Sequence, residues 1–394
     1  MTRALPARLP PGGWRQSAPV EAVVAALSAG GTPCRFVGGC VRDALLGEAP
    51  ADIDIATPLD PRSVIQCARA AGLKTVPTGI DHGTVTVIAN HVPVEVTTLR
   101  RDVETDGRHA TVAFTDDWQE DAARRDFTIN ALYAEPDGTL FDPVGGLADL
   151  AAGRVRFIGE AKARLAEDYL RALRFFRFHA RFAQGPADAA ALAAITAARQ
   201  DLTRLSAERV AAELLKTLAL PRAAEAIGLM ADCGVLAVLL PEAEGGERLA
   251  RLLPLSGDPL LRLAALLPAR PLVGAAVAGR LRLSNAQKAR LAAALVADTL
   301  PDDPAGLRRL ITLHGRQAVE DRALLAGDPA LAARICALDV PDFPLKGGDL
   351  LALGLAPGPA VSRLMKDLLD WWLAQDPPPP REACLVEARR RLGV

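Results

Sequence analysis

The sequence is poor in several features that mark common classes of protein. Aromatic residues make up only 4% of the 394 residues, and the formal net charge of −1 gives no overall basic field that would attract a nucleic acid. No apolar run approaches the roughly 18 residues of a membrane span, and the Pro-interrupted N-terminus has no apolar core of a secretory signal. We therefore expect no membrane partner, and any nucleic acid would have to bind a local basic patch.

Cysteine and histidine are also scarce. The six cysteines stand far apart without a CxxC pair, and the five histidines are scattered. This pattern argues against a zinc site and against a disulfide framework. It predicts reduced thiols in a cytoplasmic protein.

Two regions of different pattern follow one another along the chain. Residues 20–145 mix strand-like and helical patterns with dense glycine turns, whereas Leu, Ala and Arg recur at helical spacing from about 147 almost to the end. Breaks near Pro241–Gly246 and Pro268–Pro271 divide the helical region. The predicted strands are Arg35–Val37, Ile53–Ala56, Thr84–Ala89, Val92–Leu99 and Ile129–Ala134, and the predicted helices between them are Val20–Ser28, Cys40–Leu46 and Pro61–Ala71.

Two aspartates, Asp52 and Asp54, alternate with isoleucines in the stretch ADIDIAT. On a strand, both aspartates share one face and the isoleucines can enter the core. Two carboxylates about 7 Å apart on one face repel each other unless a cation lies between them, and Mg²⁺ is commonly held by one or two carboxylates and substrate phosphates. The alternative is an edge strand whose aspartates are merely solvated.

A glycine pair precedes these aspartates. Gly38 and Gly39 follow a strand and lead into a helix, so backbone N–H groups at the helix start can face an anion such as a triphosphate. Arg42 lies in the first turn and can add a charge-assisted contact. Its alternative role is a surface salt bridge with Asp43 or Asp54.

The stretches GGCVRDALLG and DIDIAT resemble the signature of the class II tRNA nucleotidyltransferase and bacterial poly(A) polymerase family, a branch of the polymerase-β-like transferases. Four further stretches resemble the next blocks of that family in order: RRDFTINALY, FDPVGGLADLAAGRVRFIG, EDYLRALRFFRF and LSAERVAAEL. The resemblance covers roughly residues 35–215. It implies an α+β fold, in which a polymerase-β-like α/β head precedes an all-helical neck, body and tail.

The domain boundaries predicted from the resemblance are a flexible lead-in at 1–19, a nucleotidyltransferase head at 20–146, a neck at 147–215 and an RNA-binding body and tail at 216–394. The resemblance also implies that Arg125 contacts the triphosphate; its alternative is an ion pair with Asp121 or Asp126. The segment from Leu99 to Phe114 is polar and has no periodicity, so we expect a mobile loop.

Glu95 alternates with Val94 and Val96 in VPVEVTTLR and points away from these core-facing valines. It is the candidate third catalytic carboxylate beside Asp52 and Asp54. The alternative is a surface glutamate paired with Arg100 or Arg101.

The segment Glu167–Phe178 is predicted as one helix, on which Asp168 and Arg171 are three residues apart and Arg174 and Arg177 continue the same face. Asp can accept from an exocyclic amine, and Arg can donate to a ring nitrogen or carbonyl oxygen. Such a pair would choose cytosine and adenine over guanine and uracil. The resemblance implies that Asp168 and Arg171 form this protein template, with Arg174 and Arg177 near the triphosphate. An ordinary solvated helix face is the alternative.

The sequence therefore predicts an enzyme that adds CCA to the tRNA acceptor end from CTP and ATP without a template. The predicted mechanism is two-metal nucleotidyl transfer, with two Mg²⁺ ions held by Asp52 and Asp54. Residues 153–182 hold eight basic and three acidic residues, a local patch that can attract RNA. A poly(A) polymerase, an enzyme that adds only CC or only A, and a non-catalytic RNA-binding protein remain as alternatives.

Overall fold

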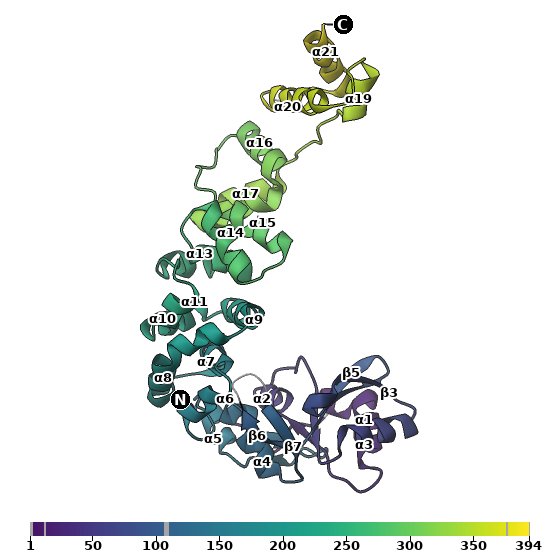
Figure 1. The fold of residues 1–394 in the computed structure, drawn as a ribbon, viewed down its shortest axis with the longest axis vertical. Coiled ribbons are helices and arrows are strands. Elements are labelled where there is room, and N and C mark those ends of the chain that lie inside the picture. Colours follow the sequence, from purple (N-terminus) through teal and green to yellow (C-terminus); the bar gives the residue numbers. More distant parts are fainter. Residues whose placement is uncertain (1–2, 12, 106–109, 376, 394) are drawn as a thin grey trace. The chain divides into compact units, whose positions relative to one another are not determined.

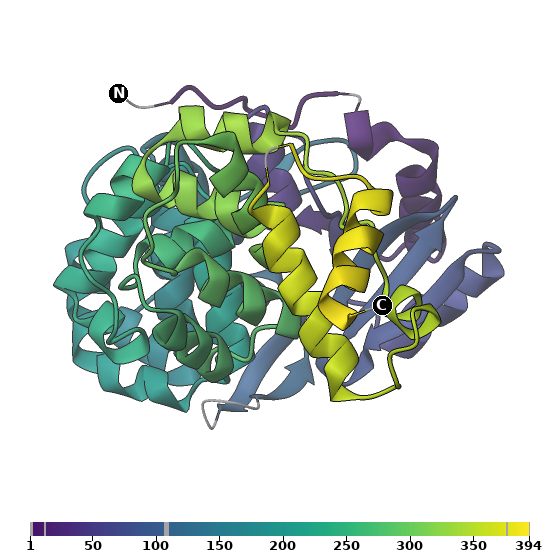
Figure 2. The ribbon, with the colours of Figure 1, turned by 90° about the horizontal axis from the view of Figure 1, so that it is seen from above.

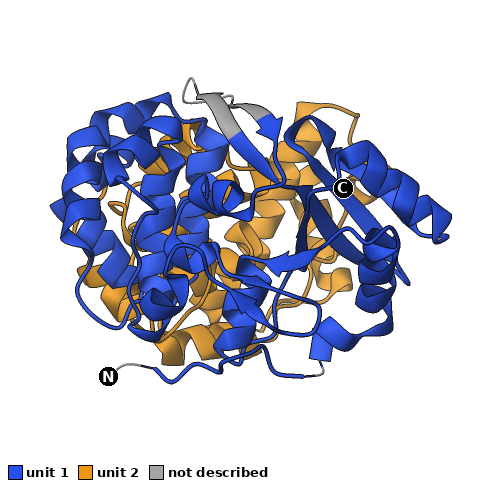
Figure 3. Ribbon diagram, turned by 90° about the horizontal axis from the view of Figure 1, so that it is seen from below, with its two compact units in different colours: residues 1–241 blue, residues 242–394 orange. Residues whose placement is uncertain are grey.

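The computed structural model describes residues 3–11, 13–105, 110–375 and 377–393. It divides into two compact units, Met1–Pro241 and Glu242–Val394 (Figure 3). The boundary between the units falls at the first of the two predicted breaks. Among the described residues, no helix is both long enough and apolar enough to cross a membrane.

The first unit contains a seven-stranded sheet, two strands of which, β3 and β5, are labelled in Figure 1. The strand order is β3-β4-β5-β2-β1-β8-β9. Strand β2 is parallel to β5 and antiparallel to β1. Helices α1 and α3 pack against β4 and β5. The bounds are α1 Ala18–Ser28, β1 Arg35–Val37, β2 Asp54–Thr57, α3 Pro61–Ala70, β3 Lys74–Gly79, β4 Thr84–Ala89, β5 Val92–Thr98, β8 Tyr133–Ala134 and β9 Leu140–Phe141.

Alternation along β5 separates the core from the site. Val94 and Val96 are fully buried, whereas Glu95 between them is exposed, as the period of a strand predicts. Strand β2 does not alternate in this way, because Ile55, Ala56 and Thr57 are all buried and only Asp54 at its start is half-buried.

Two of the elements expected before residue 146 are wrong. One strand is expected over residues 129–134, but the chain forms the short 3-10 helix η3 at Thr128–Asn130 before the two-residue strand β8. The segment expected as a loop forms two paired strands, β6 at Arg100–Thr105 and β7 at Ala110–Phe114. Residues 106–109 of that segment lie outside the described residues.

Helices complete the first unit. The predicted helix at 167–178 is instead two helices, because the chain leaves α6 after Glu167 and enters α7 at Leu170. The bounds are α2 Gly39–Leu45, α4 Trp118–Ala123, α5 Gly146–Ala151, α6 Ala161–Glu167, α7 Leu170–Phe182, α8 Ala189–Ala198, η4 Arg199–Arg204, α9 Ala207–Leu218, α10 Ala223–Asp232 and α11 Val235–Leu239.

The second unit is helical throughout its described residues. One hydrophobic cluster joins α16, α17 and α18, and another joins α19, α20 and α21 around the buried Trp372. Helices α20 and α21 pack side by side (Figure 2). The bounds are α12 Glu247–Leu252, α13 Pro259–Ala265, α14 Pro271–Arg280, α15 Asn285–Ala294, α16 Pro304–His314, α17 Arg316–Ala326, α18 Pro329–Ala337, α19 Gly347–Ala352, α20 Pro359–Leu373 and α21 Arg381–Leu392.

Candidate active site

The turn between β1 and α2 depends on glycine. Gly38 has φ of +74°, and its N–H donates to the Leu132 carbonyl at 2.9 Å. A Cβ atom at Gly38 would meet the Asn130 carbonyl oxygen at 3.4 Å and Arg125 Nη1 at 3.6 Å. The turn therefore needs a residue that tolerates positive φ. Because glycine has no Cβ atom, another group can approach the backbone of the turn closely.

The carboxylate of Asp54 lines the same cavity as this turn, and the carboxylates of Glu95 and Asp52 act on it electrostatically. Asp54 pairs with Glu95 in the parallel register of β2 and β5, and the Glu95 N–H donates to the Ile53 carbonyl at 2.9 Å. Burial, then Glu95, and more weakly Asp52 raise the pKa of Asp54 to about 6, against an opposing effect of Arg125. Crowded carboxylates of this kind favour a bound cation.

Asp52 departs from the expected geometry. Strand β2 begins at Asp54, and the exposed Asp52 lies in the bend before it. The argument from strand alternation therefore applies to Asp54 but not to Asp52. The structure couples the two residues electrostatically without placing them on one strand face.

The carboxylates have the chemistry of ligands for a divalent metal. Within the described part of the chain, no group of three or more His, Cys, Asp or Glu side chains is arranged to hold a metal ion. Magnesium does not require such a cage, because it is usually bound through one or two carboxylates and substrate phosphates. The carboxylate of Asp54 supplies hard oxygen donors, which fit this way of binding Mg²⁺. Asp52 and Glu95 are close enough to raise the pKa of Asp54.

Asp121 fixes the arginine nearest to the glycine turn. Its buried carboxylate accepts from Arg124 at 2.7 Å, from Arg125 at 3.0 Å and from the Tyr133 hydroxyl at 2.7 Å. Burial alone would raise the pKa of Asp121, but Arg125 and Arg124 lower it to about 2. The predicted alternative for Arg125, an ion pair with Asp121, is confirmed, and the same side chain also reaches Gly38.

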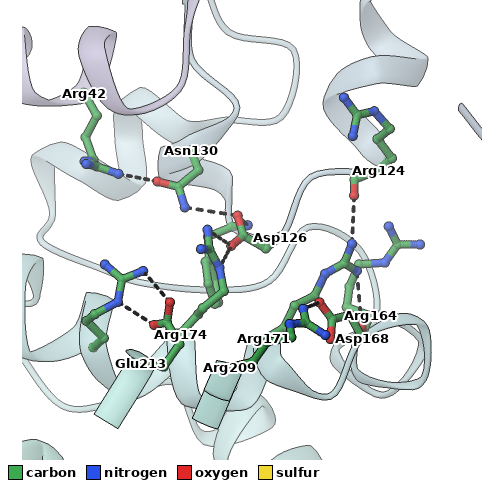
Figure 4. Close-up of polar contacts among 12 residues, drawn as sticks. Arg42, Arg124, Asp126, Asn130, Arg164, Asp168, Arg171, Arg174, Arg209 and Glu213 are labelled. Atoms are coloured by element: carbon green, nitrogen blue, oxygen red, sulfur yellow. Dashed lines mark hydrogen bonds and ion pairs between the residues drawn. The ribbon is translucent and has the colours of Figure 1, made fainter. Parts of the chain in front are cut away.

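A second network runs from α2 to α7 (Figure 4). The buried Arg42 pairs with Asp43 at 2.7 Å and donates to the side-chain oxygen of Asn130. Asn130 donates to Asp126 at 3.0 Å, and Asp126 accepts from Arg174 at 2.6 Å. Arg42 therefore pairs with Asp43, one of the two partners that the alternative named, but the pair is buried and not on the surface, and it holds Arg42 in a fixed position.

The segment predicted to select bases has a different geometry from the one expected. Asp168 is not helical; it has an extended backbone (φ −155°, ψ 105°) between α6 and α7. Its Oδ1 accepts from the Leu170 N–H at 3.0 Å, and its Oδ2 accepts from Arg209 at 2.7 Å. Asp168 therefore lies between the two helices, two residues before α7 begins, and the expected i, i+3 pair on one helix is wrong.

The arginines of α7 that face the cavity are held by acidic residues or carbonyl groups. Arg171 pairs with Glu167 and donates to the Arg124 carbonyl at 3.1 Å. Arg177 pairs with Glu213 of α9 at 2.6 Å.

These elements enclose one cavity of about 470 Å³. Nine of the predicted site residues line it: Gly38, Gly39, Arg42, Asp54, Arg125, Asp168, Arg171, Arg174 and Arg177. Asp52 and Glu95 do not line it. The remaining lining residues, which sequence reasoning did not place in the site, are Arg124, Asp126, Asn130, Leu170, Phe178 and Arg209.

A signal for some of the missed residues was present in the sequence. Asp126 and Asn130 are polar positions in the largely apolar stretch DFTINALY. They lie four residues apart, a spacing that brings side chains together in helical backbone but not across a strand. Arg209 lies in the LSAERVAAEL stretch and gave no such signal, because its partner is 41 residues away.

Comparison with known proteins gives two family matches. Residues 34–156 match the poly A polymerase head domain, and residues 188–245 match the probable RNA and SrmB-binding site of polymerase A.

Named relatives and a solved structure agree with these matches. The chain is 35% identical to the mitochondrial CCA tRNA nucleotidyltransferase 1 of Mus musculus, over 86% of this chain and 82% of the mouse protein. It is 40% identical to the CCA-adding enzyme of Geobacillus thermodenitrificans, over 58% of this chain and 56% of that enzyme. The fold is similar to that of the Bacillus stearothermophilus CCA-adding enzyme in complex with CTP, with a TM-score of 0.76, 28% identity and coverage of 96% of this chain and 99% of that one.

Replacing Asp121 by Asn should destabilise the first unit. We expect a loss of about 3 kcal/mol in the free energy of unfolding at neutral pH, because two half-buried guanidinium groups lose the buried carboxylate that is their counter-charge. A carboxyl whose pKa is lowered by folding stabilises the fold above its unfolded pKa, of about 4, and this contribution disappears as the pH falls towards 2. The difference between wild type and variant should therefore shrink in acid.

Urea unfolding measured at several pH values tests this expectation. Asp232→Asn, which changes an exposed residue at the end of α10, is the matched control and should unfold like the wild type. Equal stability of Asp121→Asn and wild type at neutral pH would contradict the role given to Asp121.

Proposed function

Because the chain belongs to the family of CCA tRNA nucleotidyltransferases and poly(A) polymerases, we propose that it adds CCA to the 3′ ends of tRNA, using CTP and ATP and no nucleic-acid template. The observation that carries this proposal is the convergence on one cavity of a carboxylate, a glycine turn, a set of arginines and the Asp168–Arg171 pair. The relatives named CCA-adding enzyme and the complex of one of them with CTP support the same reaction.

In this proposal the arginines around the glycine turn bind the triphosphate. Arg125 and Arg42 have fixed side chains beside Gly38 and Gly39, and Arg174 faces the same cavity from α7. Preorganised cations stabilise the charge that develops on the phosphates as pyrophosphate leaves. The 3′ oxygen of the RNA bonds to the α-phosphorus, and the bond from that phosphorus to the oxygen bridging to the β-phosphate breaks.

Base selection falls to Asp168 and Arg171. Asp168 accepts from the exocyclic amine that cytosine and adenine share, and Arg171 donates to the neighbouring ring nitrogen. Uracil and guanine present a carbonyl oxygen where the amine should be. That oxygen meets the carboxylate unfavourably, so both nucleotides are rejected.

Enzymes of this family generally use a divalent metal, and we propose Mg²⁺ held by Asp52 and Asp54. A bound Mg²⁺ would lower the pKa of the attacking 3′ hydroxyl and neutralise charge on the phosphates. Glu95, beside Asp54 in the sheet, is proposed as the group that orients this hydroxyl. Its exposure leaves it accessible to an RNA end.

We propose the head at residues 20–146, the neck at 147–215 and an RNA-binding body and tail at 216–394. The match of residues 188–245 to a probable RNA-binding site supports RNA contacts near the start of the body. The six cysteines are free, which fits the proposed cytoplasmic location. The mouse relative is named as mitochondrial.

An incorporation assay tests the reaction. The substrates are tRNA ending at the discriminator base, at C and at CC, and an unstructured RNA, with the four nucleoside triphosphates supplied singly and together. We expect two C and one A on tRNA, followed by arrest. Long A tails on every RNA would replace the proposal with a poly(A) polymerase, and no incorporation would favour an RNA-binding protein.

Substitution of the aspartates tests the metal assignment. Asp52→Ala and Asp54→Ala should each lower incorporation on the order of a thousandfold, because metal stabilisation of phosphoryl transfer amounts to several kcal/mol. Binding of tRNA, measured by filter retention, should stay at the wild-type level. Asp116→Ala, at an exposed aspartate outside the cavity, is the control. Incorporation by Asp54→Ala at the wild-type rate would refute the assignment.

A further inference from the structure

The carboxylate of Asp168 is held at both of its oxygens, and the two donors come from different elements. The Leu170 N–H at the start of α7 donates to Oδ1 at 3.0 Å. Arg209 of α9 donates to Oδ2 at 2.7 Å, and Figure 4 draws the side chains of Arg209 and Asp168. A carboxylate with one oxygen bound can still turn about its Cβ–Cγ bond. With both oxygens bound, its plane is fixed.

The ion pair of Arg209 with Asp168 is poorly placed to stabilise the fold. The side chain of Arg209 is 42% exposed and that of Asp168 is 30% exposed. Ion pairs this accessible to water contribute little to stability, since solvent screens them and two side chains must be ordered. Both residues line the cavity.

Helix α9 supports the base-selecting segment at a second point. Glu213, one turn after Arg209, is buried and pairs with Arg177 at 2.6 Å. One face of α9 therefore contacts both Asp168, which precedes α7, and Arg177, which lies on α7.

We propose that Arg209 is a positioning residue for nucleotide selection: it fixes the Asp168 carboxylate so that the carboxylate accepts only from an amine in the position that cytosine and adenine offer. This inference rests on the proposed function. A carboxylate has about four acceptor sites, and the two that Leu170 and Arg209 occupy leave one on each oxygen for a base.

The chemistry of the bases predicts the effect of losing Arg209. A carboxylate free to turn can accept from the ring N–H of uracil or guanine, which lies next to the carbonyl that the fixed carboxylate rejects. Discrimination against UTP and GTP would fall more than incorporation of CTP and ATP.

Another role for Arg209 makes a different prediction. Arg209 lines the same cavity and carries a positive charge, so it could bind a phosphate of the nucleotide or of the RNA directly. Loss of such a contact would weaken all four nucleotides by the same factor and leave their ratios unchanged.

The test is the kcat/KM for single-nucleotide incorporation of CTP, ATP, GTP and UTP on matched tRNA ends. In Arg209→Met we expect the preference for CTP over UTP to fall about tenfold, the value of one charge-assisted hydrogen bond. Arg209→Lys keeps the charge and a hydrogen-bond donor, so its preference for CTP over UTP should lie between that of Arg209→Met and that of the wild type. Lys216→Met removes an exposed positive charge from the same helix and should keep the wild-type preference.

A double substitution tests whether Arg209 acts through Asp168. In an Asp168→Asn background, adding Arg209→Met should change the preference by less than about twofold, because the positioned group is already altered. Independent effects that multiply, or equal losses for all four nucleotides, would overturn the inference.

Equilibrium binding separates this inference from the reaction itself. The ratio of the CTP and UTP dissociation constants needs no turnover, so Arg209→Met should lower the preference for CTP in binding even if incorporation is absent. An unchanged binding preference would overturn the role of Arg209. The proposed function is decided separately, by the incorporation assay on the wild type and Lys216→Met.

Discussion

The arrangement of the site depends on how the mutual repulsion of its arginines is offset. Seven guanidinium groups line one cavity, where the surrounding protein limits screening by water. Acidic partners offset this repulsion: Asp121 holds two of the arginines, Asp126 holds Arg174 and Glu213 holds Arg177. These pairs fix the positions of charges that a triphosphate can then use.

The same constraint explains why chain segments far apart in sequence meet at the cavity. Asp126 comes from the head, yet it joins Asn130 and Arg42 on one side to Arg174 of α7 on the other. Arg171 donates to the Arg124 carbonyl, so the base-selecting segment is also bonded to the arginine pair near the turn. Triphosphate binding and base selection thus share one hydrogen-bonded framework.

Local patterns predicted much of this arrangement. Alternation placed Glu95 opposite the buried valines of β5, and the glycine pair predicted the turn between β1 and α2. The predictions from periodicity were wrong where polar residues interrupt a segment. This occurs at η3, where a strand was predicted, and between α6 and α7, where one continuous helix was predicted. Arg209 could not be predicted, because its partner Asp168 is brought close by the packing of α9 against α7 and no local pattern carries that contact.

A structure of the chain with bound CTP tests the central claim, that protein side chains alone recognise the base. The account predicts the amine of cytosine within hydrogen-bond distance of Asp168, the ring nitrogen of cytosine facing Arg171 and the triphosphate along Arg42, Arg125 and Arg174. A cytosine that contacts neither Asp168 nor Arg171 would contradict it.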